Sequence, residues 1–385
     1  MIKRIFFKNY KSFKEQQVLE LKPMTVLIGK NSSGKSAIAK LPTLIENSLS
    51  GSFSEPLLLS NNGVELGAEF KDLITERSRI GSLYLAIEDE SQKLEVVIGA
   101  GTGTKDIPKV FSWTLRNAED VYESNESDQF KGFVLQSQFE SSKIKTLKLN
   151  TEYIGPFREL PIRSYSRPNS SKIEKVGIDG GGAYPLLIQS ALTTEGLLIN
   201  EVSTWYQNHF QGWGVRVNED KDPFFQIELV RNGGNLAINI KDVGQGMSQA
   251  LPLVTRAFME TMDQTLIIIE QPELHLHSAV HGDIAELFLK SIERGGRQYL
   301  IETHSQNFVL RIRRLVAERV INKDDVVIYY ADFDEKTGTS ILKRIDILDD
   351  GKVSYWPTNV FSETLEETIA IRTAQLKNPE HADSN

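Results

Sequence analysis

The stretch that decides the fold is MTVLIGKNSSGKS, residues 24–36. Its apolar opening, 24–29, predicts a buried central strand. The strand ends at a glycine, and a helix with apolar spacing is predicted to follow over 35–49. GKNSSGKS fits the pattern G-x-x-x-x-G-K-[ST], in which small residues let backbone N–H groups wrap a phosphate at a helix start. The predicted phosphate-binding residues are Gly29, Lys30, Asn31, Ser32, Ser33, Gly34, Lys35 and Ser36.

A phosphate loop also needs a metal partner. In this pattern Lys35 reaches the β and γ phosphates, and the Ser36 hydroxyl is offered to Mg²⁺. An acid at the end of a neighbouring strand usually holds the ion or its water shell. The apolar run 266–269 ends at Glu270. We therefore predict Ser36 and Glu270 as the magnesium-binding residues.

The residue after Glu270 is an amide, in the sequence TLIIIEQPELHLH, residues 265–277. Gln271 can orient a water molecule but cannot take its proton, and loss of a general base typically costs ~10²–10⁴ in rate. Two outcomes follow. Either Glu273, beyond a proline turn, is the base, or the site hydrolyses slowly and long-lived nucleotide binding acts as a timer. The sequence favours slow hydrolysis.

Two further segments have the composition of anion sites. QYLIETHS, 298–305, reads as another buried strand, and His304 just past it would lie at the carboxyl edge of a parallel sheet, where ligands sit. DVGQGMSQ, 242–249, places Gly244, Gly246 and Ser248 before a helix predicted over 247–262. The alternative for this second segment is a plain helix cap by Ser248 or Asp242.

Composition narrows the class of protein. The chain has 385 residues, no cysteine and a formal charge of -8. These values exclude disulfides and thiolate zinc sites, and they argue against a protein coated in nucleic acid. The chain has no apolar run of the ~18 residues that a membrane span needs, and its start lacks a signal-peptide core. A cytoplasmic location and no membrane contact are expected.

The order of predicted elements indicates an α/β fold. From 246 onward helices and strands alternate, which implies a mostly parallel sheet flanked by helices. Short strand-like runs between about 80 and 150 predict an antiparallel lobe. The other predicted elements are strands at 2–7, 18–21, 213–218, 224–230, 236–240, 265–270, 297–302, 325–331, 339–347 and 353–356, and helices at 184–210, 279–293 and 305–319.

The four site segments, in this order, resemble the ATP-binding heads of the ABC-type superfamily, in its RecF/SMC-like branch. They also resemble compact prokaryotic AAA-type ATPases related to the overcoming-lysogenization-defect family. The resemblance includes IKRIFFKNYKSF at the start, IGPFRELPIRSY at 154–165 and LIETHSQNFVLRIRRLVAE at 300–318. It covers most of 1–356 and is thin between 80 and 150.

The resemblance implies one ABC-type head over 1–356, divided into a phosphate-loop part (1–80), an antiparallel β lobe (81–150), a helical and β signature subdomain (151–245) and a C-terminal part (246–356). An acidic helix and polar tail follow at 357–385. It further implies that ATP is sandwiched in a head-to-head dimer or larger homo-oligomer. In that arrangement the signature residues Gly246, Ser248 and Gln249 meet the partner's nucleotide, and His304 is the switch histidine.

Three functions are consistent with these segments. The first is a slow ATPase switch acting with nucleic acid or an effector protein, in prokaryotic anti-phage defence or DNA maintenance. The second is an ATP-locked oligomeric scaffold that sequesters a toxin or nuclease. The third is a nuclease in its own right, which rests only on Asp332 and Asp334 in a segment that reads as a hairpin.

Two features outside these segments invite other interpretations. His275, His277 and His281 lie close together, and the last two have a spacing that suits zinc. Two basic clusters could contact DNA or RNA, although solvated or internally paired charges are the alternative. The clusters comprise Arg158, Arg163, Arg167, Lys172 and Lys175, and Arg311, Arg313, Arg314 and Arg319.

Overall fold

The computed structural model describes residues 1–100, 107–125, 128–136, 147–168, 173–193, 195–221, 223–234, 236–358 and 360–377. Its central sheet has the strand order β12-β17-β18-β3-β19-β20, and every pairing is parallel except β19 with β20. The strands are β12 (Thr151–Ile154), β17 (Thr265–Glu270), β18 (Arg297–Glu302), β3 (Met24–Gly29), β19 (Val326–Asp334) and β20 (Thr339–Ile345). The predicted parallel sheet is confirmed, and β3, β17 and β18 have the predicted bounds.

A second, antiparallel sheet packs over one face of the central sheet, with α1 (Lys35–Ser50) in the core between them. Its order is β2-β1-β6-β7-β8-β9. The strands are β1 (Arg4–Lys8), β2 (Gln17–Glu20), β6 (Ser82–Glu88), β7 (Gln92–Ala100), β8 (Pro108–Asn117) and β9 (Val121–Glu123). The predicted β lobe thus extends into the N-terminal part. Residues 137–146 of that lobe lie outside the described residues.

Three helices cover the opposite face of the central sheet: α5 (Gln245–Phe258), α6 (Ser278–Ile292) and α7 (Gln306–Ala317). Strand residues alternate between the two cores. Ile267 and Ile269 pack with these helices, whereas Leu266 and Ile268 pack on the α1 side. Because β17 is buried on both faces, it reads as a continuous apolar run.

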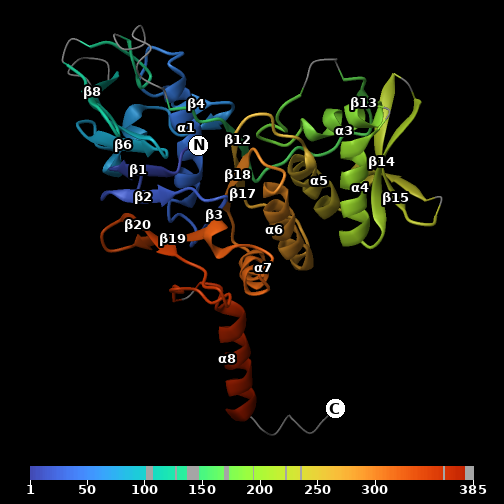
Figure 1. Ribbon diagram of the computed structural model, residues 1–385. Helices are drawn as coiled ribbons and strands as arrows, with labels where there is room; N and C mark the ends of the chain where they lie inside the picture. Colours follow the sequence, from blue (N-terminus) through green and yellow to red (C-terminus); the bar gives the residue numbers. More distant parts are fainter. Residues whose placement is uncertain are drawn as a thin grey trace.

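The part of the chain between β12 and α5 forms a further lobe, drawn in green and yellow in Figure 1, whose helices pack on α5. Its helices are α3 (Ala183–Ala191) and α4 (Leu197–His209). The helical region predicted over about 184–210 is confirmed as two helices, which are separated before Gly196, a residue with a left-handed φ of 55°. α4 packs on the sheet of β13 (Tyr165–Ser166), β14 (Trp213–Lys221), β15 (Phe224–Arg231) and β16 (Ala237–Asn239).

Several elements have different bounds in the structure from those predicted. α5 ends at Phe258 rather than 262, and the predicted strand at 353–356 is reduced to one bridge between Ile347 and Val353. Short strands that were not predicted include β4 (Ser60–Asn61), β5 (Val64–Glu65) and β10 (Phe130–Lys131), whereas β11 (Val134–Leu135) lies within a strand-like run predicted at 133–139. The acidic helix is α8 (Glu363–Lys377), which projects from the body (Figure 1). Within the described ranges, every helix is too short or too polar to cross a membrane.

Candidate nucleotide site at the carboxyl edge of the central sheet

The loop between β3 and α1 folds around the ammonium group of Lys35. The Lys35 Nζ donates to the carbonyl oxygens of Gly29 (3.0 Å) and Lys30 (2.7 Å), and its side chain is buried. Burial lowers the pKa of Lys35. α1 begins at Lys35 without a side-chain cap, so the N–H groups of its first turn are available to an anion. The predicted loop residues therefore lie together as a phosphate loop requires.

Glycine is needed at Gly34 for two reasons. Its φ of 94° lies in a region that side chains disfavour. A Cβ there would also lie 2.7 Å from the ring of Phe13 and 2.8 Å from the Ser12 hydroxyl. Ser12 and Phe13, in the turn between β1 and β2, lie so close to the loop that the second glycine of the motif is required.

Two carboxylates, Glu270 and Glu302, end adjacent strands in register. β18 lies between β17 and β3, so Glu302 stands between Glu270 and the loop. The Ser36 hydroxyl donates to Glu302, and burial followed by the charge of Glu270 raises the pKa of Glu302 to about 7. Burial also raises the pKa of Glu270, whose carboxylate accepts from the Tyr153 hydroxyl. Sequence reasoning assigned Glu270 but missed Glu302, because only the strand order reveals its place.

Each acid keeps one buried oxygen that has no hydrogen-bond partner among the described residues, Oε1 of Glu270 and Oε2 of Glu302. Buried polar atoms are normally satisfied, so such atoms call for an explanation. Carboxylate and hydroxyl oxygens are the ligands that Mg²⁺ prefers. The residues at this edge thus fit a hard divalent cation next to a phosphate loop.

Glu273 is bound to the loop that carries the predicted switch histidine. Its Oε2 accepts from the Thr303 hydroxyl (2.9 Å), and its Oε1 accepts from the backbone N–H of His304 (2.6 Å). Burial, followed by the positive charge of Lys35, lowers the pKa of His304, which favours the neutral ring. Gln271 has a left-handed φ of 46°, and its N–H donates to the carbonyl of Glu302 (2.7 Å). The residues predicted as catalytic from the sequence lie at the same edge of the sheet as the loop; they are Glu270, Gln271, Glu273 and His304.

The predicted signature residues form the first turn of α5. Gly244 and Gln245 are exposed, and this helix start has no side-chain cap. The alternative of a plain cap is wrong for the described structure, because Ser248 lies inside the helix and Asp242 pairs with Arg163 (2.7 Å). Ser248 is buried, with its hydroxyl donating to the carbonyl of Gln245 (3.1 Å).

A buried arginine links α5 to the turn after β17 through hydrogen bonds. Arg158 donates from Nη2 to the carbonyl of Gln271 (2.7 Å), and its own carbonyl accepts from Nε2 of Gln249 (3.2 Å). Burial lowers the pKa of Arg158 to about 10. A Cβ at Gly246 would lie 2.9 Å from the carbonyl oxygen of His275, so the helix start and the turn are in close contact. Arg158 therefore does not belong to an exposed basic cluster.

The sequence matches a known protein family over most of the site described above. A family model described as "AAA domain, putative AbiEii toxin, Type IV TA system" matches residues 24–311. This chain belongs to that AAA-domain family. The matched range begins at β3 and ends in α7, so it contains the loop, both acids, the signature helix and the switch loop. The AAA-domain chain is accordingly a nucleotide-binding ATPase domain.

Three solved structures are similar to this chain. The SMC head bound to the C-winged helix domain of ScpA shares 13% identity over 90% of this chain and 98% of its own, with a TM-score of 0.51. The SMC head domain from Thermotoga maritima shares 11% over 90% and 99%, with a TM-score of 0.47. The Smc head from Pyrococcus furiosus, with an extended coiled coil and bound to the C-terminal domain of ScpA, shares 11% over 96% and 99%, with a TM-score of 0.49. The likeness to the first of these shows the fold of an SMC head. The comparison with curated proteins gave no match.

Two of the three histidines beyond β17, His277 and His281, have structural partners in the AAA-domain chain. His281 contacts the Ser305 hydroxyl (2.8 Å) and the carbonyl of Leu276 (3.1 Å), and His277 accepts from the N–H of Ala279 at the start of α6. The described residues contain no group of three or more His, Cys, Asp or Glu that could hold a metal. The zinc interpretation is therefore not supported.

The two aspartates of the nuclease hypothesis belong to the hairpin β19–β20, as predicted. Asp332 pairs with Lys343 (2.8 Å) across the hairpin. Asp334 accepts from the N–H of Lys336 and the hydroxyl of Thr337. Both carboxylates are occupied by the hairpin itself, which removes the reason to place a metal there.

Most residues of the two basic clusters are paired within the chain. Arg311 forms ion pairs with Asp283 (2.9 Å) and Glu286 (2.7 Å), and Arg314 pairs with Glu318 (3.5 Å). Lys175 donates to Asn150 and to the carbonyl of Thr151. Lys172 lies outside the described residues. Internal pairing, the alternative interpretation of these clusters, accounts for Arg163, Lys175, Arg311 and Arg314.

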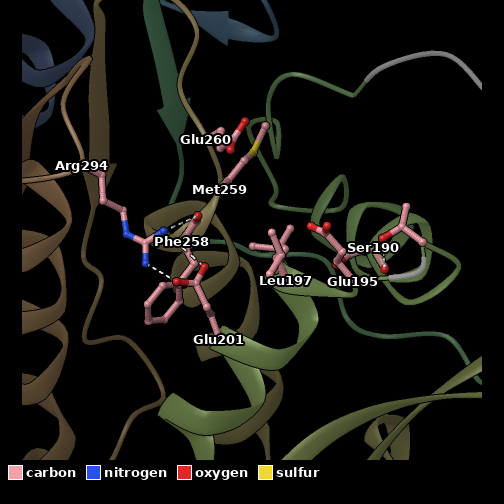
Figure 2. Close-up of a pocket in the computed structure, with 10 residues that line it drawn as sticks. Ser190, Glu195, Leu197, Glu201, Phe258, Met259, Glu260 and Arg294 are labelled. Carbon is pink, nitrogen blue, oxygen red and sulfur yellow. Dashed lines mark hydrogen bonds and ion pairs between the residues drawn. The ribbon is translucent and has the colours of Figure 1, made fainter.

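A separate hollow of about 780 Å³ lies beside α4 and the end of α5 (Figure 2). Arg294 spans one side of it, paired with Glu201 and donating to the carbonyl of Phe258 (3.2 Å). None of the predicted nucleotide-binding residues lines this hollow. It is not part of the nucleotide site.

Proposed function

We propose that this AAA-domain protein binds ATP with Mg²⁺ and hydrolyses it slowly, as a switch. The loop residues Gly29–Ser36 would hold the phosphates, and Ser36 with Glu270 would hold the ion. Mg²⁺ supplies charge neutralisation of the phosphates when bound. Lys35 would bind the β and γ phosphates, and the neutral ring of His304 would face the γ-phosphate.

The observation that carries the slow rate is the position of Glu273. Both of its carboxylate oxygens are engaged by residues 303–304, and the neighbouring position is the amide of Gln271. A general base must reach the water whose proton it abstracts. A carboxylate that anchors the switch loop serves this role poorly, so turnover is expected to be limited by proton transfer.

The switch is proposed to act through an ATP sandwich between two copies. The exposed, uncapped start of α5 would meet the nucleotide bound by the partner, as expected for a helix N-terminus facing an anion. The closed dimer would act on an effector protein, a nuclease or toxin, or on nucleic acid, in a defence or DNA-maintenance setting. The Gln271 amide also favours the alternative of an ATP-locked scaffold that sequesters such a partner.

The test is to measure ATP binding, phosphate release and molecular mass together, for the wild type and Lys35→Ala. We expect wild-type chain to bind ATP, to increase in mass with ATP and Mg²⁺, and to release phosphate slowly. Lys35→Ala should lose binding and remain at its nucleotide-free mass. Equal ATP binding by both proteins would exclude the loop as the site, and rapid turnover by the wild type would exclude the scaffold alternative. Repeating the assay with DNA tests the nucleic-acid role.

A further inference from the structure

Glu302 contacts the hydroxyl that the phosphate loop would offer to a metal. It ends β18, the strand between β17 and β3, and its side chain is almost completely buried. Ser36 donates to it, and its Oε2 has no partner among the described residues.

The pair of acids creates an electrostatic problem that a cation resolves. Glu270 and Glu302 are Cα partners on adjacent parallel strands, and both are buried. Two buried carboxylates repel one another and are costly to keep ionised without a positive partner. The ammonium of Lys35 lies close enough to act on both acids, but it already donates to two loop carbonyls. Lys40, which also acts on Glu270, stands over the ring of Tyr153.

We infer that Glu302 is a second carboxylate of the magnesium site, acting with Ser36 and Glu270. This inference rests on the proposed ATP-binding function. Without metal, Glu302 holds the Ser36 hydroxyl at the start of α1. With Mg²⁺, the oxygen atoms of Ser36 and of the two acids face the ion or its bound water, and the free Oε2 of Glu302 gains a partner. Mg²⁺ binding by one or two carboxylates together with substrate phosphates is the usual arrangement.

The test measures how strongly Mg²⁺ improves nucleotide binding, independently of turnover. A fluorescent ATP analogue is titrated into wild-type protein, Glu302→Gln and Lys35→Ala, once with EDTA and once with Mg²⁺. The ratio of the two Kd values reports the coupling between ion and nucleotide. The amide keeps the shape and can still accept from Ser36, but it removes the charge. Asp332→Asn removes a carboxylate outside the site and is the matched control.

We expect Glu302→Gln to reduce the effect of Mg²⁺ on Kd by roughly 10–100-fold, as is typical when a metal site loses a supporting group. Its Kd in EDTA should be unchanged or tighter, because a negative charge near the phosphates is gone. Asp332→Asn should retain the wild-type ratio. A wild-type ratio for Glu302→Gln overturns the inference but leaves the proposed function intact.

Two further outcomes remain distinguishable. If wild-type protein does not bind the analogue, or Lys35→Ala binds it equally well, the proposed function fails and the inference falls with it. If Glu302→Gln does not fold, as judged by a missing thermal transition, Glu302→Asp replaces it. That variant keeps the charge but shortens the side chain, and we expect its Mg²⁺ ratio to fall by roughly threefold or more. An unchanged ratio contradicts the inference.

Discussion

At the residue scale, hydrolysis depends on which side chain can take a proton from the attacking water. Glu273 is the acid nearest in sequence to Gln271 at the end of β17, after Glu270. Its bonds to Thr303 and to the His304 N–H give it a different task, which is to fix the switch loop against the turn after β17. The proton acceptor for the attacking water is therefore missing at position 271, where the side chain is the amide of Gln271.

We expect Gln271→Glu to accelerate ATP hydrolysis, because it supplies a general base whose presence is typically worth ~10²–10⁴ in rate. Glu273→Gln should change the rate by less than about tenfold, since the amide oxygen can still accept from His304 and its NH₂ can donate to Thr303. Phosphate release under single-turnover conditions measures both. A loss of turnover in Glu273→Gln, with ATP binding and dimer mass retained, would identify Glu273 as the base.

The sequence reveals only part of the site. The loop, Glu270 and His304 are recognisable because each follows an apolar run that must be a buried strand. Glu302 also ends such a run, but the run alone does not place it beside the loop, and Arg158 has no such signal. Glu302 becomes a site residue only because β18 is inserted between β17 and β3, and Arg158 is buried by segments that lie far from it in sequence. Residue type alone placed Arg158 in a basic cluster.

At the element scale, strands with an apolar run buried on both faces are the easiest to predict, whereas the equally buried but partly polar β12 was not predicted. β3, β17 and β18 have no exposed residue to interrupt the apolar run, so their bounds follow from the sequence. β8 was not predicted, because only Trp113 and Leu115 are buried along it. The break between α3 and α4 is similarly hidden, since apolar residues continue at helical spacing on both sides of it. Long-range pairing and solvent exposure decide these cases.

The start of α1 provides a test of the loop geometry. Gly34→Ala places a methyl group against the Phe13 ring and the Ser12 hydroxyl at a left-handed φ. Such strain costs about 1–3 kcal/mol before the clash is counted. We expect a lower midpoint of thermal unfolding and a loss of ATP binding, because the N–H groups of the first turn are displaced.

Gly338→Ala is the matched control for this variant. Gly338 also has a positive φ, 67°, but a Cβ there meets no atom within 4 Å. It should therefore lose stability through backbone strain alone and keep wild-type ATP affinity. If Gly34→Ala binds ATP as tightly as Gly338→Ala does, the contact between the loop and Phe13 is not a requirement of the site.

At the scale of the whole molecule, the nucleotide site lies where two hydrophobic cores meet. One core contains α1 and the antiparallel sheet, and the other contains α5, α6 and α7. A buried ion pair between Arg256 on α5 and Glu152 on β12 fixes the signature helix to the edge of the central sheet. Because breaking a buried pair is strongly destabilising, α5 is expected to keep its position relative to β17. Its exposed N-terminus then remains available to a second molecule.

If ATP is sandwiched between two copies of the chain, two variants that are each inactive alone should complement one another when they are mixed. A site formed within a single chain would not show such complementation. Lys35→Ala removes the phosphate lysine. Gly244→Glu places a negative charge at the exposed start of α5, where a Cβ meets no atom within 4 Å, so the fold should be retained. A carboxylate there suits the helix dipole but repels a phosphate held across the interface.

Each variant alone is expected to be inactive, whereas an equal mixture should recover roughly a quarter of wild-type turnover, because half of the dimers are mixed and each mixed dimer has one complete site. Gly244→Gln, a neutral variant of the same size, should retain activity. If Gly244→Glu alone hydrolyses ATP at the wild-type rate, or if the mixture stays inactive, the start of α5 does not face the partner's nucleotide.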